Sequence, residues 1–201
     1  VVARMISVVN RWVMHEADYI ILPDENREDG LPSAYKSKTT IVTNAPDLDE
    51  ELLSDLRDVP SITENLDLFY YGSLAEDRGI DVLLDAAERL PHVNVWFAGW
   101  GNMATQIEQV ASEQDNVHFL GSLSHQAVME RVAAMDLIVI MYDPEYGVNQ
   151  MASPNKLFEA MALGKPVVVA RDTSIDVLVE GRKMGWAVDY SAKALVALIR
   201  S

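Results

Sequence analysis

The sequence contains no cysteine among its 201 residues. A disulfide, a thiol nucleophile and a cysteine-ligated metal are therefore excluded. Histidine is also scarce, and the four histidines stand at positions 15, 92, 118 and 125 without the spacing of metal ligands. We expect each histidine to be structural or exposed, and we predict no metal site.

Long apolar runs are missing as well, so the sequence predicts no transmembrane segment and no secretory signal. Basic residues are few, because 16 Lys and Arg stand against 31 Asp and Glu and give a formal net charge of −15. A field of that sign repels nucleic acid and anionic lipid headgroups, which argues against nucleic acid as a partner. If the ligand is anionic, only a few Lys or Arg side chains close to it can bind it.

Aromatic residues make up only 7% of the chain, whereas 49% of it is hydrophobic, a composition that suits an α/β protein and excludes disorder. From Leu66 onward, strand-like and helix-like segments alternate, which is typical of a doubly wound parallel sheet. The predicted strands span residues 68–71, 94–98, 117–120, 137–141, 167–170 and 185–188. The predicted helices span residues 82–90, 103–114, 124–135, 154–163, 175–180 and 192–200. We expect a Rossmann-like sheet with helices on both faces.

The segment before Leu66 is organised differently. Helical spacing covers residues 1–16, and strand-like runs cover 17–22 and 39–43, with a loop or broken helix between them. An acidic helix or linker at 47–58 and a loop at 60–65 are expected next. The chain begins Val1-Val2 without an initiator methionine, so we expect it to be a piece of something longer.

The most informative segment is the run from Ser153 to Ala170. Ser153 is a good N-cap with Pro154 at the first helical position, and Gly164 suits the left-handed residue that closes a helix. Lys156 falls in the first helical turn, where the macrodipole disfavours a cation unless an anion is present. Together with Glu159 and the free backbone N–H groups, it indicates a seat for a phosphorylated ligand. A capped packing helix with a solvated lysine is the alternative.

Three predicted strands end in glycine, at Gly72, Gly99 and Gly121. Ligands of open α/β sheets bind outside the carboxyl ends of the strands, and glycine lets backbone approach a phosphate closely. Arg78 follows the first of these glycines, and a guanidinium can hold a diphosphate through two parallel hydrogen bonds. Ordinary tight turns and a surface arginine are the alternatives.

The run from Ser153 to Ala170 also resembles the signature helix of the retaining glycosyltransferases of group 1, which have two Rossmann-like domains. In that family two glutamates, separated by seven residues, lead into a run like Ala-Met-Ala-x-Gly-Lys-Pro-Val. Glu159 matches the second glutamate, whereas Met151 stands where the first would fall. The form Ser-Pro-x-Lys-Leu-x-Glu occurs in one branch of the family, so we interpret the segment as a variant.

The resemblance implies a site for a nucleotide diphosphate sugar, the donor substrate, with no other cofactor. Arg78 and Lys156 would neutralise the leaving diphosphate, and Glu159 would hydrogen-bond the ribose. Arg78 takes the place of the family's lysine, and Ser73 replaces its arginine. The remaining residues of the expected donor site are Gly72, Ser73, Gly99, Gly101, Leu120, Ser122, Asn149, Gln150, Ser153 and Asn155.

Two parts of this expected site carry narrower predictions. The loop that holds Leu120 and Ser122 resembles the one that packs the nucleobase, largely through backbone groups. Asn149 or Gln150 is expected to replace the missing glutamate by hydrogen-bonding sugar hydroxyls, with a simple lid loop as the alternative.

A nicotinamide enzyme is a rival, because Gly99-Trp100-Gly101 followed by Ala104 fits a loose dinucleotide fingerprint. Two observations argue against this rival. No acidic residue stands at the end of the next predicted strand, where it would bind the ribose. The fingerprint is also expected in the first βαβ unit, whereas here it lies in the second. The resembled family has a Gly-x-Gly turn at the same point.

The resemblance therefore implies two regions. Residues 1–46 would be the remnant of an acceptor-side domain with its linker, and 47–201 the donor-binding domain of a retaining glycosyltransferase. The fragment alone is expected to be inactive, since a glycan or lipid-linked acceptor would bind through the missing domain. A sugar-nucleotide epimerase and a non-catalytic nucleotide-sugar-binding module remain alternatives. We expect a cytoplasmic protein, with the missing domain as the candidate membrane contact.

Overall fold

The computed structural model describes residues 2–23, 27–28, 31–46, 54 and 65–201. It divides into two compact units, Val1–Asn44 and Ala45–Ser201. The acidic segment predicted at 47–58 and the loop predicted at 60–65 lie almost entirely outside the described residues, as does the predicted domain boundary at Asp47.

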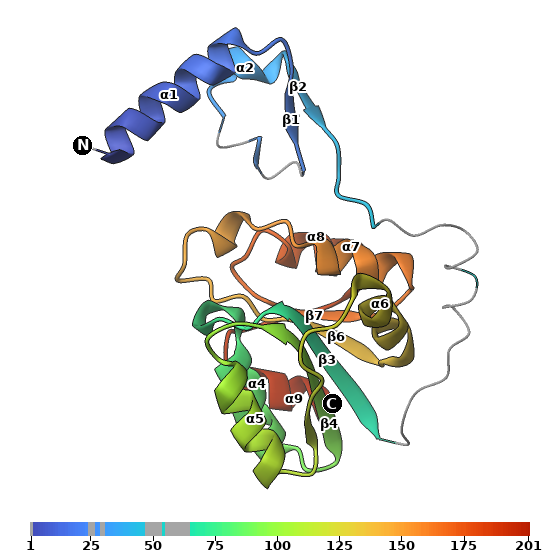
Figure 1. The fold of residues 1–201 in the computed structure, drawn as a ribbon. Coiled ribbons are helices and arrows are strands. Elements are labelled where there is room, and N and C mark those ends of the chain that lie inside the picture. Colours follow the sequence, from blue (N-terminus) through green and yellow to red (C-terminus); the bar gives the residue numbers. More distant parts are fainter. Residues whose placement is uncertain (1, 24–26, 29–30, 47–53, 55–64) are drawn as a thin grey trace. The chain divides into compact units, whose positions relative to one another are not determined.

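The first unit is small (Figure 1). Its elements are α1 (Val2–Glu16), β1 (Ile20–Leu22), α2 (Ser33–Lys36) and β2 (Thr39–Ile41). The two strands pair in parallel. Lys38 links the end of α1 to this two-stranded sheet, because its ammonium donates to the carbonyl oxygens of His15 at 3.0 Å and Ala17 at 2.6 Å. The helix expected at 1–16 and both predicted strand positions are confirmed.

The second unit is built on one six-stranded sheet in which every neighbouring pair is parallel. Its strands are β3 (Leu66–Ser73), β4 (Val93–Trp100), β5 (Val117–Phe119), β6 (Leu137–Ile140), β7 (Val167–Ala170) and β8 (Gly185–Val188). They lie in the order β5-β4-β3-β6-β7-β8. Counted from β3, this is the order 3-2-1-4-5-6 of dinucleotide-binding sheets. The Rossmann-like fold predicted from the sequence is confirmed, with each strand within two residues of its expected limits.

Helices cover both faces of this sheet (Figure 1). They are α4 (Ile80–Arg89), α5 (Ala104–Glu113), α6 (His125–Ala134), α7 (Asn155–Ala162), α8 (Asp176–Gly181) and α9 (Ala192–Ile199). Side chains of α4, α5 and α9 share one hydrophobic core with alternate residues of the strands, among them Tyr70 and Val139. Side chains of α6, α7 and α8 share a second core with the intervening residues, such as Phe69 and Ile138. The alternation follows from the two-residue period of strands.

The helix α7 begins one residue later than its sequence predicts. Pro154 occupies the N-cap position in an extended conformation, where the sequence predicts Ser153. The other end agrees with the prediction, because Gly164 adopts a left-handed φ of 65°. Its amide donates to the Met161 carbonyl at 3.1 Å. Because the helix begins at Asn155, Lys156 lies at its second position.

In the ranges that the structure describes, no helix is long and apolar enough to cross a membrane.

Candidate functional site

The candidate site is a cavity of roughly 320 Å³ at the carboxyl edge of the sheet, lined by the ends of β3 and β4 and by Tyr142, which follows β6. The strand order reverses between β3 and β6, and open α/β sheets bind ligands at such a switch point. A larger hollow of roughly 700 Å³ lies at the amino ends of β7 and β8, around Pro166 and Gly185. We favour the smaller cavity, because helix N-termini and strand carboxyl ends converge only on that edge. Its lining comprises Tyr71, Gly72, Ala98, Gly99, Trp100, Ser122, Leu123, His125, Val128, Tyr142, Pro154, Asn155, Lys156 and Glu159.

Lys156 is the buried cation of this cavity, with 8% of its surface exposed. Its ammonium lies 4.0 Å from the centroid of the Tyr70 ring, and 5.4 and 5.5 Å from those of Tyr71 and Tyr142. No carboxylate forms a salt bridge with it among the described residues. Burial and repulsion by Arg78 lower the pKa of Lys156 to about 7, against a smaller upward effect of Glu159. A buried cation without a paired anion is costly and favours an anionic ligand.

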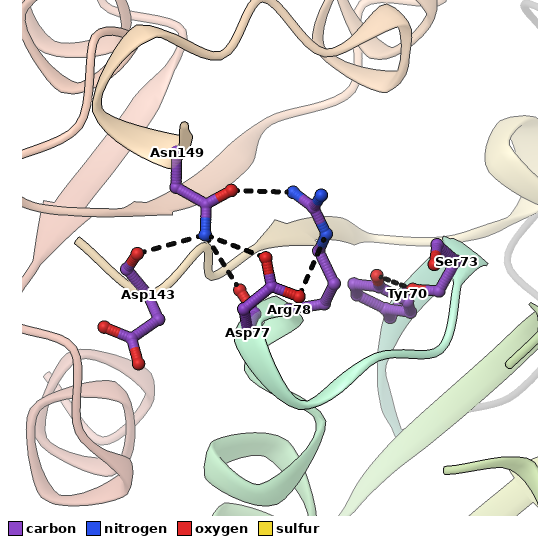
Figure 2. A network of polar contacts seen from close by, with 6 residues as sticks. All are labelled: Tyr70, Ser73, Asp77, Arg78, Asp143 and Asn149. Carbon is purple, nitrogen blue, oxygen red and sulfur yellow. Dashed lines mark hydrogen bonds and ion pairs between the residues drawn. The ribbon is translucent and has the colours of Figure 1, made fainter. Parts of the chain in front are cut away.

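Arg78 is held in a network of polar contacts (Figure 2). Its Nη1 donates to Asn149 Oδ1 at 2.9 Å, and its Nε lies 3.6 Å from Asp77 Oδ1. The Asn149 amide nitrogen lies within 3.2 Å of three oxygens, namely the Asp77 carbonyl, Asp77 Oδ2 and the Asp143 carbonyl. Asn149 is completely buried. Its side chain therefore orients Arg78 and faces no open cavity, unlike the sugar contact expected from the sequence.

The Tyr142 ring is shared by the two cations. The guanidinium carbon of Arg78 lies 4.4 Å from its centroid, and the Lys156 ammonium lies 5.5 Å from it. Tyr142 lines the cavity, whereas Arg78 does not and contacts the cavity wall through this ring. Burial is the largest effect on the Tyr142 phenol and raises its pKa, so the ring stays neutral. Two cations are thus gathered at one edge of an otherwise acidic protein.

Glu159 is buried and hydrogen-bonded on both carboxylate oxygens. Oε2 accepts from the Tyr71 hydroxyl at 2.7 Å, and Oε1 lies 3.2 Å from His125 Nε2. Burial and the neighbouring carboxylate raise the pKa of Tyr71, so its hydroxyl stays a donor. The carboxylate is therefore fixed at the cavity wall by β3 and α6, while 10% of its side chain remains accessible.

Two of the strand-end glycines have different reasons for being glycine. A Cβ at Gly99 would lie 1.8 Å from the carbonyl oxygen of Gly72, so β3 and β4 could not stay paired. A Cβ at Gly72 would lie 3.6 Å from the Lys156 ammonium, inside the cavity. Gly99 is thus required by packing between strands, whereas Gly72 is required by its φ of 114°, which other residues rarely adopt, since a Cβ there would make only an ordinary contact with Lys156.

The structure gathers six of the thirteen site residues predicted from the sequence around the cavity. These are Gly72, Gly99, Ser122, Asn155, Lys156 and Glu159. The others do not line it. They are Ser73, Arg78, Gly101, Leu120, Asn149, Gln150 and Ser153. Gln150 instead donates to the Pro144 carbonyl at 2.8 Å from an exposed position. A Cβ at Gly101 would lie 2.2 Å from the Leu74 carbonyl, a backbone packing constraint.

Sequence reasoning missed eight of the fourteen lining residues, and the aromatic ones among them are Tyr71, Trp100, His125 and Tyr142. Tyr71 is the last residue of the predicted strand 68–71, and Tyr142 follows the predicted strand 137–141, so neither stands out as a site residue. His125 follows the N-cap Ser124, whose hydroxyl accepts from the Ala127 amide at 3.3 Å, and the sequence predicts only that this histidine is structural or exposed. Trp100 stands between two glycines, a position that could have singled it out.

Comparison with known proteins agrees with this arrangement. A family model described as "Glycosyl transferases group 1" matches residues 65–201. The chain belongs to the group 1 glycosyltransferases. The matched residues contain the whole parallel sheet and every residue of the cavity. Within the described ranges, this glycosyltransferase chain holds no group of three His, Asp or Glu side chains able to bind a metal ion.

Named relatives cover the chain well but are themselves longer. The amylovoran biosynthesis glycosyltransferase AmsK of Erwinia amylovora is 25% identical over 152 residues, which are 72% of this chain and 37% of AmsK. Anabaena HepE, solved in complex with UDP-glucose, matches with a TM-score of 0.65 and 21% identity over 92% of this chain and 53% of its own. Sucrose-phosphate synthase of Thermosynechococcus elongatus matches with a TM-score of 0.71 and 20% identity over 96% and 51%. The chain thus spans about half the length of these two solved structures and 37% of the length of AmsK.

Proposed function

We propose that this chain is the donor-binding part of a retaining glycosyltransferase that uses a nucleotide diphosphate sugar. The observation that carries the proposal is the pair of cations, Lys156 and Arg78, which both lie within 5.5 Å of the Tyr142 ring centroid at the carboxyl edge of the sheet. Lys156 is buried without a carboxylate partner among the described residues, and a diphosphate would supply the missing negative charge. The UDP-glucose complex of the structural neighbour HepE supports this ligand class.

The cavity suggests a division of labour during transfer. The bond between the sugar's anomeric carbon and the diphosphate breaks, and negative charge grows on the departing oxygen. Lys156 and the N-terminus of α7 would stabilise that charge, with Arg78 contributing through its fixed guanidinium. Glu159 would accept a hydrogen bond from the ribose at the one wall where its carboxylate is exposed. The acceptor's hydroxyl oxygen would then bond to the anomeric carbon, and its proton would pass to the departing diphosphate oxygen.

The acceptor belongs to a part of the protein beyond the described cavity. Relatives are about twice as long as this chain or longer, and AmsK is named for the synthesis of a polysaccharide. We infer that the complete protein contributes to polysaccharide or glycoconjugate synthesis. Residues 1–46 would then belong to an acceptor-side domain, and 47–201 to the donor side.

A non-catalytic nucleotide-sugar-binding module is the second candidate. Met151 stands where the family has its first glutamate, and 54% of it is exposed. Asn149 and Gln150 are engaged by backbone and side-chain partners, so neither is free to replace that glutamate. Such a module would bind donor but transfer nothing, even with the rest of the protein present.

Calorimetry and turnover assays together test the proposal. The chain is titrated with UDP, GDP and pyrophosphate, beside Lys156→Met and an exposed control, Lys193→Met. We expect binding to the parent and the control but at least tenfold weaker binding to Lys156→Met, since a charge-assisted hydrogen bond contributes about 1.5–3 kcal/mol. Sugar transfer is then compared with a longer chain that includes the upstream half. Equal turnover would show that the site is complete within these residues, and absence of transfer by the longer chain despite binding would favour the non-catalytic module.

A further inference from the structure

Trp100 is the most exposed side chain among the tryptophans of the second unit, with 71% of its surface accessible. It ends β4 and lines the candidate cavity. Trp96, four residues earlier on the same strand, behaves differently. Its ring stacks on His118 with the centroids 3.9 Å apart, and its Nε1 donates to Asp67 Oδ1 at 2.9 Å. The strand thus packs one indole, partly buried, against its neighbours and presents the other at the rim of a cavity.

The backbone around Trp100 is fixed from both sides. Its carbonyl oxygen accepts from the Leu74 amide at 2.9 Å, and the preceding Gly99 donates to the Gly121 carbonyl at 2.9 Å. Because β4 lies between β3 and β5, Trp100 stands between two walls of the cavity. Gly72 and Lys156 form the wall on the side of β3, and Ser122 and Leu123 follow β5. Neighbouring strands are about 4.8 Å apart, so these walls are separated by roughly 10 Å.

We propose that Trp100 is a stacking platform for the aromatic base of the nucleotide that occupies this cavity. The inference rests on the proposed function, which puts the diphosphate beside Lys156. A nucleotide anchored there and extending along the edge toward Ser122 passes over the end of β4, where the exposed indole offers its flat face. Every nucleobase has a π-face, so stacking strengthens binding without choosing among bases. Selection of the base is left to the polar groups around Ser122.

An exposed indole leaves a large apolar surface in water, which is unfavourable, and a base stacked on it would remove that surface from water. Aromatic side chains bury 150–250 Å² each when covered, and exposed Trp at a cavity rim is typical of binding surfaces. Trp186 offers a matched contrast, because it is 48% exposed but lines the hollow at the amino edge of the sheet. Only Trp100 is expected to respond to a nucleotide.

The test uses the 201-residue chain with Trp100→Ala, Trp100→Phe and the control Trp186→Phe. Each is titrated calorimetrically with UDP and with inorganic pyrophosphate, which has the charge of the diphosphate but no base. Tryptophan fluorescence is recorded during the UDP titration. We expect Trp100→Ala to bind UDP about tenfold more weakly and pyrophosphate with unchanged affinity, while Trp100→Phe recovers most of the loss. Quenching by UDP should persist in Trp186→Phe and disappear in Trp100→Phe.

The outcomes separate this inference from the proposed function. Unchanged UDP affinity in Trp100→Ala overturns the stacking role while leaving the diphosphate site intact. An equal loss of UDP and pyrophosphate also overturns it, because the indole would then act on the shape of the site instead of on the base. If neither ligand binds the parent chain, the proposed function and the stacking role both fail.

Discussion

Replacement of Lys156 by methionine should make this protein more stable and at the same time weaken its binding of a diphosphate at least tenfold. The two side chains have similar length, so the methionine fills the same space between Tyr70, Tyr71 and Tyr142. What changes is the charge. A methionine needs no counterion in this buried position, whereas the ammonium has no salt-bridge partner among the described residues.

The size of the effect follows from the pKa of Lys156. It falls from 10.5 to about 7 in the folded chain, because burial and Arg78 both penalise the ammonium. Each pKa unit corresponds to 1.36 kcal/mol, so the charged form costs roughly 5 kcal/mol. Cation–π attraction to the three tyrosine rings stabilises the ammonium by on the order of 2 kcal/mol. A net destabilisation of about 3 kcal/mol remains below pH 7.

The pH dependence gives the sharpest check. Between pH 7 and 10.5 the unfolded lysine binds more protons than the folded one, so parent stability rises with pH across that window. At pH 6, Lys156→Met should melt about 6–12 °C above the parent, at about 2–4 °C per kcal/mol for a chain of this size. The gap should narrow toward pH 10, and Lys193→Met, an exposed change, should follow the parent throughout. The reasoning would be refuted if Lys156→Met melted below the parent at pH 6, or if the difference between their melting temperatures did not change with pH.

Further expectations concern the partners of the two cations and of the carboxylate. At pH 8, where most Lys156 is neutral in the free chain, UDP binding should take up close to one proton, seen as a heat that varies between Tris and Hepes; no uptake would contradict a diphosphate beside it. Asn149→Ala should weaken UDP binding more than UMP binding, because Arg78 loses its orientation; equal losses would assign Asn149 to loop structure alone. Tyr71→Phe removes a hydrogen bond to Glu159 and should cost about 1.5–3 kcal/mol in urea unfolding, whereas the exposed Tyr146→Phe should cost nothing measurable.

The sequence predicts the fold of the second unit closely, for reasons visible in its strands. Runs such as Val167–Ala170 are apolar at every position because both faces of the sheet are covered, and glycine closes α7 as its left-handed φ requires. Lys156 stood out because a cation near a helix N-terminus is unfavourable without an anion. The structure agrees, since it buries that ammonium among aromatic rings.

What the sequence could not predict were the partners that lie far away in the chain. Asn149 reaches residues 72 positions earlier, and Glu159 receives its donor from Tyr71, 88 positions earlier. Tyr142 follows the predicted strand 137–141, and nothing in the local sequence indicates that two cations lie close to its ring. For glycines the local sequence indicates a function where strand packing is already a sufficient reason. Gly99 fits a phosphate loop by its place in the sequence, yet the backbone of β3 alone already demands it.

The electrostatics of the site connect folding with the proposed binding. The protein carries a formal charge of −15, yet it buries one cation and fixes a second beside the same tyrosine ring. Repulsion from Arg78 is part of what lowers the pKa of Lys156, so the two cations interact unfavourably with each other at this site. A dianion would relieve the desolvated ammonium and the repulsion between the two cations together. Natural proteins keep destabilising groups where function needs them. The instability assigned to Lys156 and the affinity assigned to it are therefore two consequences of one uncompensated charge, which is why a single substitution should change both in opposite directions.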